Sequence, residues 1–123
     1  MIEKIIDIPI YDWDVTFLIV EDKKDIPDLN KWYNLFQARY VGDLNKEFDN
    51  IKNAGQTFID RTAQKILVTI FPCTNFAEKL VTIGHEKRHV EDLILEECGI
   101  NDKEAAAYLS GYLSQYMFYF MKE

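Results

Sequence analysis

Two histidines stand four residues apart in a segment of helical character, and a glutamate directly follows the first of them. The segment is His85-Glu86-Lys87-Arg88-His89, and it contains both histidines of the chain. Residues four apart lie one above the other on the same face of an α-helix. Two imidazoles placed in this way can bind one metal ion, with Zn–N distances of about 2.0–2.1 Å. Glu86 would then be placed to take a proton from a water molecule at that ion.

A second interpretation of this segment needs no metal. The H-E-x-x-H pattern is short enough to occur by chance, and histidines on a charged helix can simply be solvated. A catalytic zinc usually keeps three protein ligands and one open position for water. The metal interpretation therefore depends on a third ligand from elsewhere in the chain.

The third ligand has to be a carboxylate if the site is to follow the His₂Glu type. The longer pattern H-E-x-x-H-x-x-G-x-x-H does not fit, because Asp92 stands at its glycine position and Leu95 at its third histidine position. The candidate is Glu104, near the start of the next predicted helix, where the alanines at 105–107 would let two helices approach closely. Alternatively, Asn101-x-x-Glu104 is the spacing of a capping box, in which Glu104 only caps its own helix.

Two tyrosines follow Glu104 at helical spacing, Tyr108 after one turn and Tyr112 after two. Either phenol could donate a hydrogen bond to an oxyanion that develops during the reaction. In the alternative interpretation both are core tyrosines whose hydroxyl groups find partners within the protein.

The segments T-I-G-H-E-K-R-H (82–89) and N-D-K-E-A-A-A-Y-L (101–109), with the short connection between them, resemble the small gluzincin-type zinc metallopeptidases. More narrowly, they resemble the compact zincin-like proteins of bacterial and phage genomes. The resemblance covers about residue 65 to the C-terminus. It implies that His85, His89 and Glu104 bind Zn²⁺ and that Glu86 is the general base in peptide-bond hydrolysis. It also implies that a strand before the motif helix lines the cleft and pairs with an extended peptide or protein substrate.

The chain departs from large gluzincins in its short length and in the tight spacing between His89 and Glu104. A non-catalytic alternative is therefore a binding or regulatory module on the same scaffold, with structural zinc or no metal. Its support is the aromatic end of the last predicted helix. If these residues are exposed, they would form a homodimer or partner interface; if they are buried, they complete a small core. The aromatic residues are Tyr116, Phe118, Tyr119 and Phe120.

Length and charge limit the remaining classes of function. The 123 residues suit one domain, spanning 1–123, with a modest core. The net charge of −7 argues against nucleic acid as a partner. The first residues lack the features of a signal peptide, and polar residues interrupt the most apolar segment, 105–121, so we expect no membrane span. These features favour a cytoplasmic protein.

The two cysteines, Cys73 and Cys98, flank the predicted motif helix. At a rise of about 1.5 Å per residue, a straight helix would hold them roughly 35 Å apart, which is too far for a disulfide. We therefore expect free thiols, as in a reducing compartment.

Hydrophobic periodicity predicts an α+β, zincin-like fold in which a small, mainly antiparallel sheet packs against the motif helix and a C-terminal helix. At Tyr11 to Asp14 the pattern leaves open whether the chain forms a hairpin turn or a bend in one long strand. The segment 43–54 is either a short helix or an ordered loop. The expected elements are strand at 2–20, a helix from Asp28 to about Tyr40, a hairpin of strands 55–60 and 65–71, a helix from Asn75 to Cys98, and a last helix from Asn101 or Asp102 to about Met121.

Overall fold

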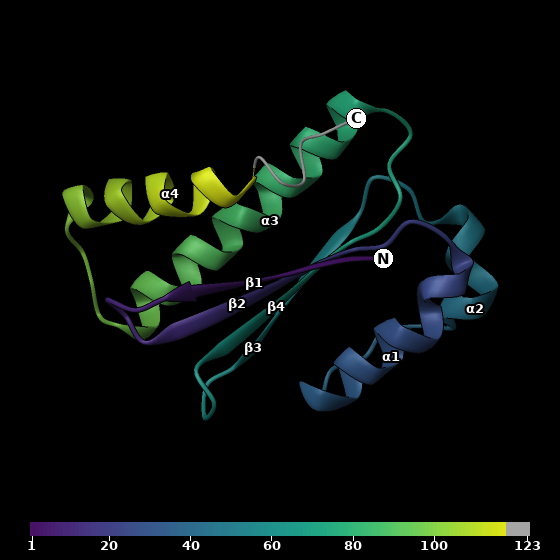
Figure 1. The fold of residues 1–123 in the computed structure, drawn as a ribbon, viewed down its shortest axis with the longest axis horizontal. Coiled ribbons are helices and arrows are strands. Elements are labelled where there is room, and N and C mark those ends of the chain that lie inside the picture. Colours follow the sequence, from purple (N-terminus) through teal and green to yellow (C-terminus); the bar gives the residue numbers. More distant parts are fainter. Residues whose placement is uncertain (118–123) are drawn as a thin grey trace.

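The computed structural model describes residues 1–117, and it arranges them in three layers (Figure 1). A four-stranded sheet forms the middle layer, a pair of long helices covers one face, and shorter helices cover the other. The strands are β1 (Ile2–Ile8), β2 (Trp13–Ile19), β3 (Gly55–Asp60) and β4 (Lys65–Ile70). The long helices are α3 (Phe76–Glu97) and α4 (Lys103–Met117); the opposite layer holds α1 (Ile26–Leu35) and α2 (Leu44–Glu47), with 3₁₀ turns at Lys23–Asp25 and Phe48–Asn50.

The strand order is β1-β2-β4-β3, so β1 and β3 are the two edges of the sheet. The pairs β1–β2 and β3–β4 are antiparallel, whereas the central pair β2–β4 is parallel. The predicted α+β class and mainly antiparallel sheet are confirmed. The parallel centre was not expected from the sequence. After β2 the chain forms the α1–α2 layer and then returns to the sheet as the edge strand β3. It turns back as β4, which lies between β3 and β2 and runs parallel to β2.

A hairpin joins the first two strands, which resolves the alternative left open at Tyr11 to Asp14. The backbone N–H of Tyr11 donates to the Ile8 carbonyl oxygen at 3.2 Å, and Asp12 has a positive φ of 57°. Aspartate tolerates this left-handed conformation better than most residues. Trp13 follows directly and is buried, so it anchors the start of β2 in the core.

Two hydrophobic clusters lie on opposite faces of the sheet, because successive side chains of each strand point to opposite faces. Central strand β2 contributes to both clusters and is buried throughout most of its length, which explains its continuous apolar sequence. The α3–α4 side contains, among others, Val15, Phe17, Val68, Ile83, Val90, Ile94, Leu109 and Leu113. The α1–α2 side contains Leu18, Val20, Ile26, Leu29, Tyr33, Leu44, Phe48, Leu67 and Phe71.

Helix α1 is shorter than predicted and starts earlier. It begins at Ile26, with Asp25 rather than Asp28 at the N-cap position, and it ends at Leu35 instead of near Tyr40. The start is set by the preceding 3₁₀ turn and by a proline in the first helical turn, where its missing N–H costs nothing. The end is set by Gln37, whose φ of 53° is incompatible with a continuing helix.

The ends of α3 agree with the prediction. The Asn75 side-chain oxygen accepts a hydrogen bond from the Glu78 backbone N–H at 2.9 Å, and Gly99, with φ of 66°, follows the Cys98 C-cap. In α4 it is Asp102 that accepts from the Glu104 N–H, at 3.0 Å. The predicted end of that helix, near Met121, lies outside the described residues.

Three further expectations concern the surface of the molecule. Cys73 and Cys98 are both free, as predicted. Within residues 1–117, no helix combines the length and apolar character needed to cross a membrane. Of the aromatic residues predicted as a dimer interface, Tyr116 is partly buried against the α3–α4 cluster. Phe118, Tyr119 and Phe120 lie outside the described residues.

Candidate metal centre

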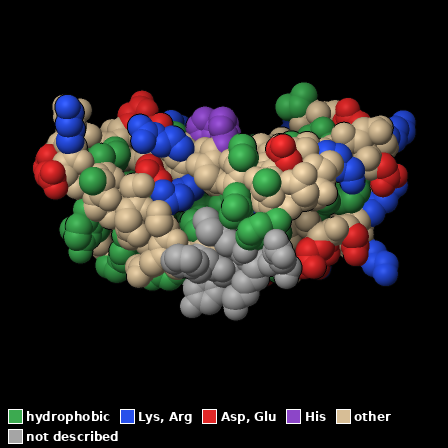
Figure 2. Space-filling view, turned by 90° about the horizontal axis from the view of Figure 1, so that it is seen from above, with side chains coloured by type: hydrophobic (Ala, Val, Ile, Leu, Met, Phe, Trp, Pro, Cys, Tyr) green, Lys and Arg blue, Asp and Glu red, His purple; other side chains and the backbone are tan. Residues whose placement is uncertain are grey.

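The two histidines project from the middle of α3 and converge at their ring nitrogens. The Nε2 atoms of His85 and His89 are 3.0 Å apart, and the ring centroids are 4.6 Å apart with an angle of 85° between the planes. Both side chains are exposed, and they form one patch on the molecular surface (Figure 2). The predicted i, i+4 geometry is therefore present.

The donor atoms fit one metal ion closely. Two nitrogens that bind a tetrahedral ion at about 2.0–2.1 Å lie about 3.3 Å from each other, and the observed separation is 3.0 Å. A small rotation of either ring would complete the fit. The same separation also fits a hydrogen bond in which one Nε2–H donates to the other Nε2. The geometry thus allows a metal ion to replace a proton between the two rings.

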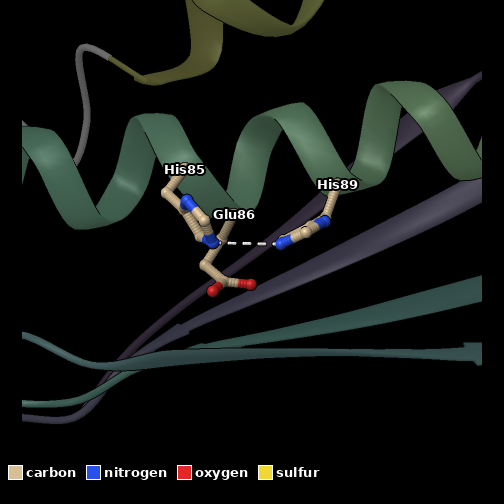
Figure 3. A group of neighbouring side chains, drawn as sticks. All are labelled: His85, Glu86 and His89. Carbon is tan, nitrogen blue, oxygen red and sulfur yellow. Dashed lines mark hydrogen bonds between the residues drawn. The ribbon is translucent and has the colours of Figure 1, made fainter.

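Glu86 differs from its neighbours because its side chain is buried, with 4% of its surface exposed. It points from α3 toward the strands of the sheet (Figure 3). The Thr57 hydroxyl on β3 donates a hydrogen bond of 2.5 Å to Glu86 Oε2. One ligand atom from each of His85, Glu86 and His89 lies within 4.8 Å of the others. Glu86 is close enough for a water molecule to fit between its carboxylate and an ion held by the histidines.

Gly55, two residues before Thr57 on β3, leaves the space that Glu86 fills. A Cβ atom at position 55 would lie 2.6 Å from Glu86 Cγ and 3.0 Å from its Cδ and Oε1. Gly55 is not among the described glycines with positive φ, so its backbone conformation does not require a glycine. The requirement is steric: only a residue without a side chain allows Glu86 to lie against this strand.

His85, Glu86 and His89 line a groove between α3 and the edge strand β3. A cavity of about 430 Å³ is bounded by Gly55, Gln56, Thr57, His85, Glu86, His89 and Leu93. A second cavity of about 350 Å³ shares Gly55, His85 and Glu86 with the first, and it extends the groove past Val81 and Glu78. A larger cavity, of about 540 Å³, lies at the carboxyl ends of β2 and β4 and contains neither histidine. The histidine pair therefore lies at the middle of an open groove with an edge strand as one wall.

The structure does not bring Glu104 to the histidine pair. Within residues 1–117, the metal-competent group around the histidines consists of His85, Glu86 and His89 alone. Helix α4 packs against a different side of α3, where Lys87 Nζ donates to Ser110 Oγ at 3.0 Å. At about 100° per residue, Lys87 points about 200° around the helix from His85. Glu104 is exposed in the first turn of α4, and its role as a ligand stays a prediction.

Neither tyrosine is among the residues that line the two cavities of the groove. Tyr108 is 71% exposed. The Tyr112 hydroxyl donates to the Asp7 carbonyl oxygen of β1 at 2.7 Å, at the edge of the sheet opposite to β3. The hydrogen bond with Tyr116, followed by burial, raises the pKa of Tyr112 to about 12. Tyr112 is therefore held at the far edge of the sheet from the histidines, and an oxyanion role for Tyr108 stays a prediction.

Sequence reasoning missed Gly55 and Thr57, which complete the surroundings of Glu86. Their alternate positions on a predicted strand put both on one face, but the sequence alone does not indicate that this face meets α3. It also missed the pairing of Lys87 with Glu91 at 2.5 Å. The signal for that pair was available, because opposite charges at i, i+4 on a helix are neighbours.

Comparison of the chain with protein-family models, with curated proteins and with solved structures gave no match.

Proposed function

We propose that this protein is a zinc-dependent peptidase that uses the groove between α3 and β3 as its active site. The observation that carries the proposal is the convergence of two histidine Nε2 atoms, 3.0 Å apart, beside a buried glutamate at the edge of a sheet. Two imidazoles, with a carboxylate nearby, suit zinc best among the available divalent ions. His85 and His89 are the proposed ligands, and Glu104, predicted from the sequence as the third, is tested separately.

Zn²⁺ at this position would polarise a peptide carbonyl and lower the pKa of a water molecule toward about 7. Glu86 is the proposed general base. Its Oε2 accepts the Thr57 hydroxyl, and no hydrogen bond to Oε1 is found in residues 1–117. Oε1 can therefore accept a proton from the attacking water, and Glu86 can then donate that proton to the leaving amine.

The proposed substrate is an extended segment of a peptide or protein. Among residues 1–117, strand β3 pairs with β4 and with no other strand, so its outer edge offers backbone N–H and C=O groups to an added strand. Because Gly55 and Thr57 belong to this strand and line the histidine cavity, a peptide paired with β3 would pass close to Glu86. The free cysteines suit a reducing compartment, and we propose that the activity is cytoplasmic.

The test is hydrolysis of a pool of fluorescence-quenched peptides by zinc-loaded protein at pH 7. Glu86→Gln is expected to keep its zinc content and lose at least about 10²-fold in turnover, because a positioned base contributes on that order. Glu96→Gln, the same change at an exposed position of α3, is the matched control and should retain activity. Undiminished cleavage by Glu86→Gln would refute the role of the base.

A non-catalytic zinc-binding module is the second candidate. Its support is that the group of possible ligands in the described part of the chain contains two histidines and Glu86 but no further carboxylate. Stoichiometric zinc binding with no cleavage of any peptide in the pool would favour this candidate over the peptidase.

A further inference from the structure

The conformation of the Glu86 side chain depends on its contacts with β3, the strand that α3 packs against. Its two neighbours in the group, His85 and His89, are exposed, whereas Glu86 is 4% exposed and lies against β3. A glutamate side chain has three rotatable bonds and loses considerable rotamer freedom when it is buried in one conformation. Contacts from β3 must therefore select the conformer that is observed.

Gly55 supplies one of these contacts through the absence of a side chain. With a Cβ atom at position 55 only 2.6 Å from Glu86 Cγ, no other residue type is compatible with the present conformer. The clash involves Cγ and Cδ, near the middle of the side chain, so movement of the carboxylate tip alone would not relieve it. Any larger residue at position 55 therefore requires either Glu86 or the β3 backbone to move from its present position.

Thr57 supplies the second contact through its hydroxyl. It lies two residues along the strand from Gly55 and so faces the same side of the sheet. Ile59, two residues further on, packs against the cluster between the sheet and α3, which identifies that side as the one facing α3. The hydroxyl binds Oε2 at 2.5 Å, which fixes the rotation of the carboxylate and directs Oε1 away from the threonine.

We infer that Gly55 and Thr57 are positioning residues for Glu86, and this inference rests on the proposed role of Glu86 as general base. Gly55 selects the rotamer of Glu86, and Thr57 orients its carboxylate so that Oε1 is available to water beside the histidines. Because both residues are on the edge strand proposed to bind substrate, the same strand holds the peptide and the base. This shared strand would fix the distance between them.

The first test uses Co²⁺ as the probe, because it accepts the same nitrogen and oxygen ligands as Zn²⁺ and its visible absorption reports the arrangement of the groups around it. Thr57→Val removes the hydroxyl and keeps the shape of the side chain. We expect it to bind Co²⁺ with unchanged stoichiometry and to shift the visible bands in the direction seen for Glu86→Gln. Thr57→Ser, which keeps a hydroxyl, should restore the wild-type spectrum.

Thr16→Val is the matched control, because Thr16 lies on β2 and lines a cavity with Ile5 and Trp32 that contains neither histidine. Its spectrum should equal that of the wild type. An unchanged spectrum for Thr57→Val overturns the inference, whether or not any peptide is cleaved. Gly55→Ala should change the spectrum more than Thr57→Val; if Gly55→Ala does not fold, the threonine variants still decide the question.

Kinetics separate this inference from the proposed function. Displacement of a reacting group by about 1 Å can cost 10²-fold in rate, so Thr57→Val is expected to lower kcat by about 10- to 100-fold with little change in KM. Loss of activity in Glu86→Gln together with full activity in Thr57→Val would leave the peptidase proposal intact and refute the role of Thr57. Full activity in Glu86→Gln would refute the proposed function itself.

Discussion

The ion pair between Lys87 and Glu91 gives the sharpest prediction about stability. Lys87 Nζ lies 2.5 Å from Glu91 Oε2, and the two side chains are 14% and 5% exposed. Lys87 also donates to Ser110 Oγ of α4 at 3.0 Å. The pair thus joins the helix that carries the histidines to its neighbour.

Replacing Lys87 by methionine should destabilise the protein strongly, because it leaves the Glu91 carboxylate buried without its partner. Breaking a buried pair in this way costs roughly 3–5 kcal/mol. Lys87 keeps some contact with solvent, which places the expected loss near the lower end, at about 3 kcal/mol. Replacing both residues, as Lys87→Met with Glu91→Leu, should recover most of that loss, because apolar pairs of similar volume are often neutral or stabilising.

The assay is equilibrium unfolding by urea at pH 7, with both circular dichroism and fluorescence as probes. Lys31→Met is the matched control, because the Lys31–Asp28 pair of α1 is separated by 3.7 Å and its side chains are 80% and 62% exposed. The Lys31→Met substitution should lower the free energy of unfolding by less than about 1 kcal/mol. If Lys87→Met unfolds within about 0.5 kcal/mol of the wild type, or if the double variant is no more stable than the single one, the Lys87–Glu91 pair does not contribute as a buried ion pair.

Three further predictions concern two glycines and the pH dependence of stability. Gly111→Ala in α4 should raise the free energy of unfolding by about 0.5–1 kcal/mol, because its Cβ would meet nothing within 4 Å and alanine favours the helix. Gly55→Ala should lower the free energy of unfolding in the same urea-unfolding assay, and an increase would contradict the predicted clash. Burial alone would raise the pKa of Asp25, but hydrogen bonds from the Glu21 and Asp22 N–H groups and the N-terminal ammonium bring it below its ordinary value. The stabilisation from Asp25 is therefore full above the unfolded-state pKa of about 3.9 and is lost as the pH falls through the lower, folded-state value. Asp25→Asn should be less stable at pH 7 and show a weaker loss on acidification; an unchanged pH profile would contradict this.

The sequence predicted the parts of the fold that depend on local interactions. The cap of α3 at Asn75, its end at Gly99 and the pairing of β3 with β4 all involve residues close together in the chain. The parallel pairing of β2 with β4 was not predicted, because it joins residues about 50 positions apart, such as Val15 and Ile66. No turn or periodic pattern specifies a pairing over that distance.

The same distinction applies to the candidate site. The convergence of His85 and His89 follows from helical spacing alone, and it was predicted. Thr57 and Glu86 are 29 positions apart in the chain, and they come into contact because α3 packs on β3. The position of Glu104 depends on how α4 crosses α3, which the helical period does not determine.

The zinc content of the purified protein shows whether His85 and His89 form a metal site. Tag-free protein, purified without chelators and incubated with Zn²⁺, is expected to retain about one ion per chain, and His89→Ala is expected to lose it. Glu104→Ala measured beside it decides whether that carboxylate is a ligand: loss of the ion would include it, and retention would exclude it. Absence of zinc from the wild type, or equal zinc in the wild type and His89→Ala, would mean that the two histidines do not form a zinc site.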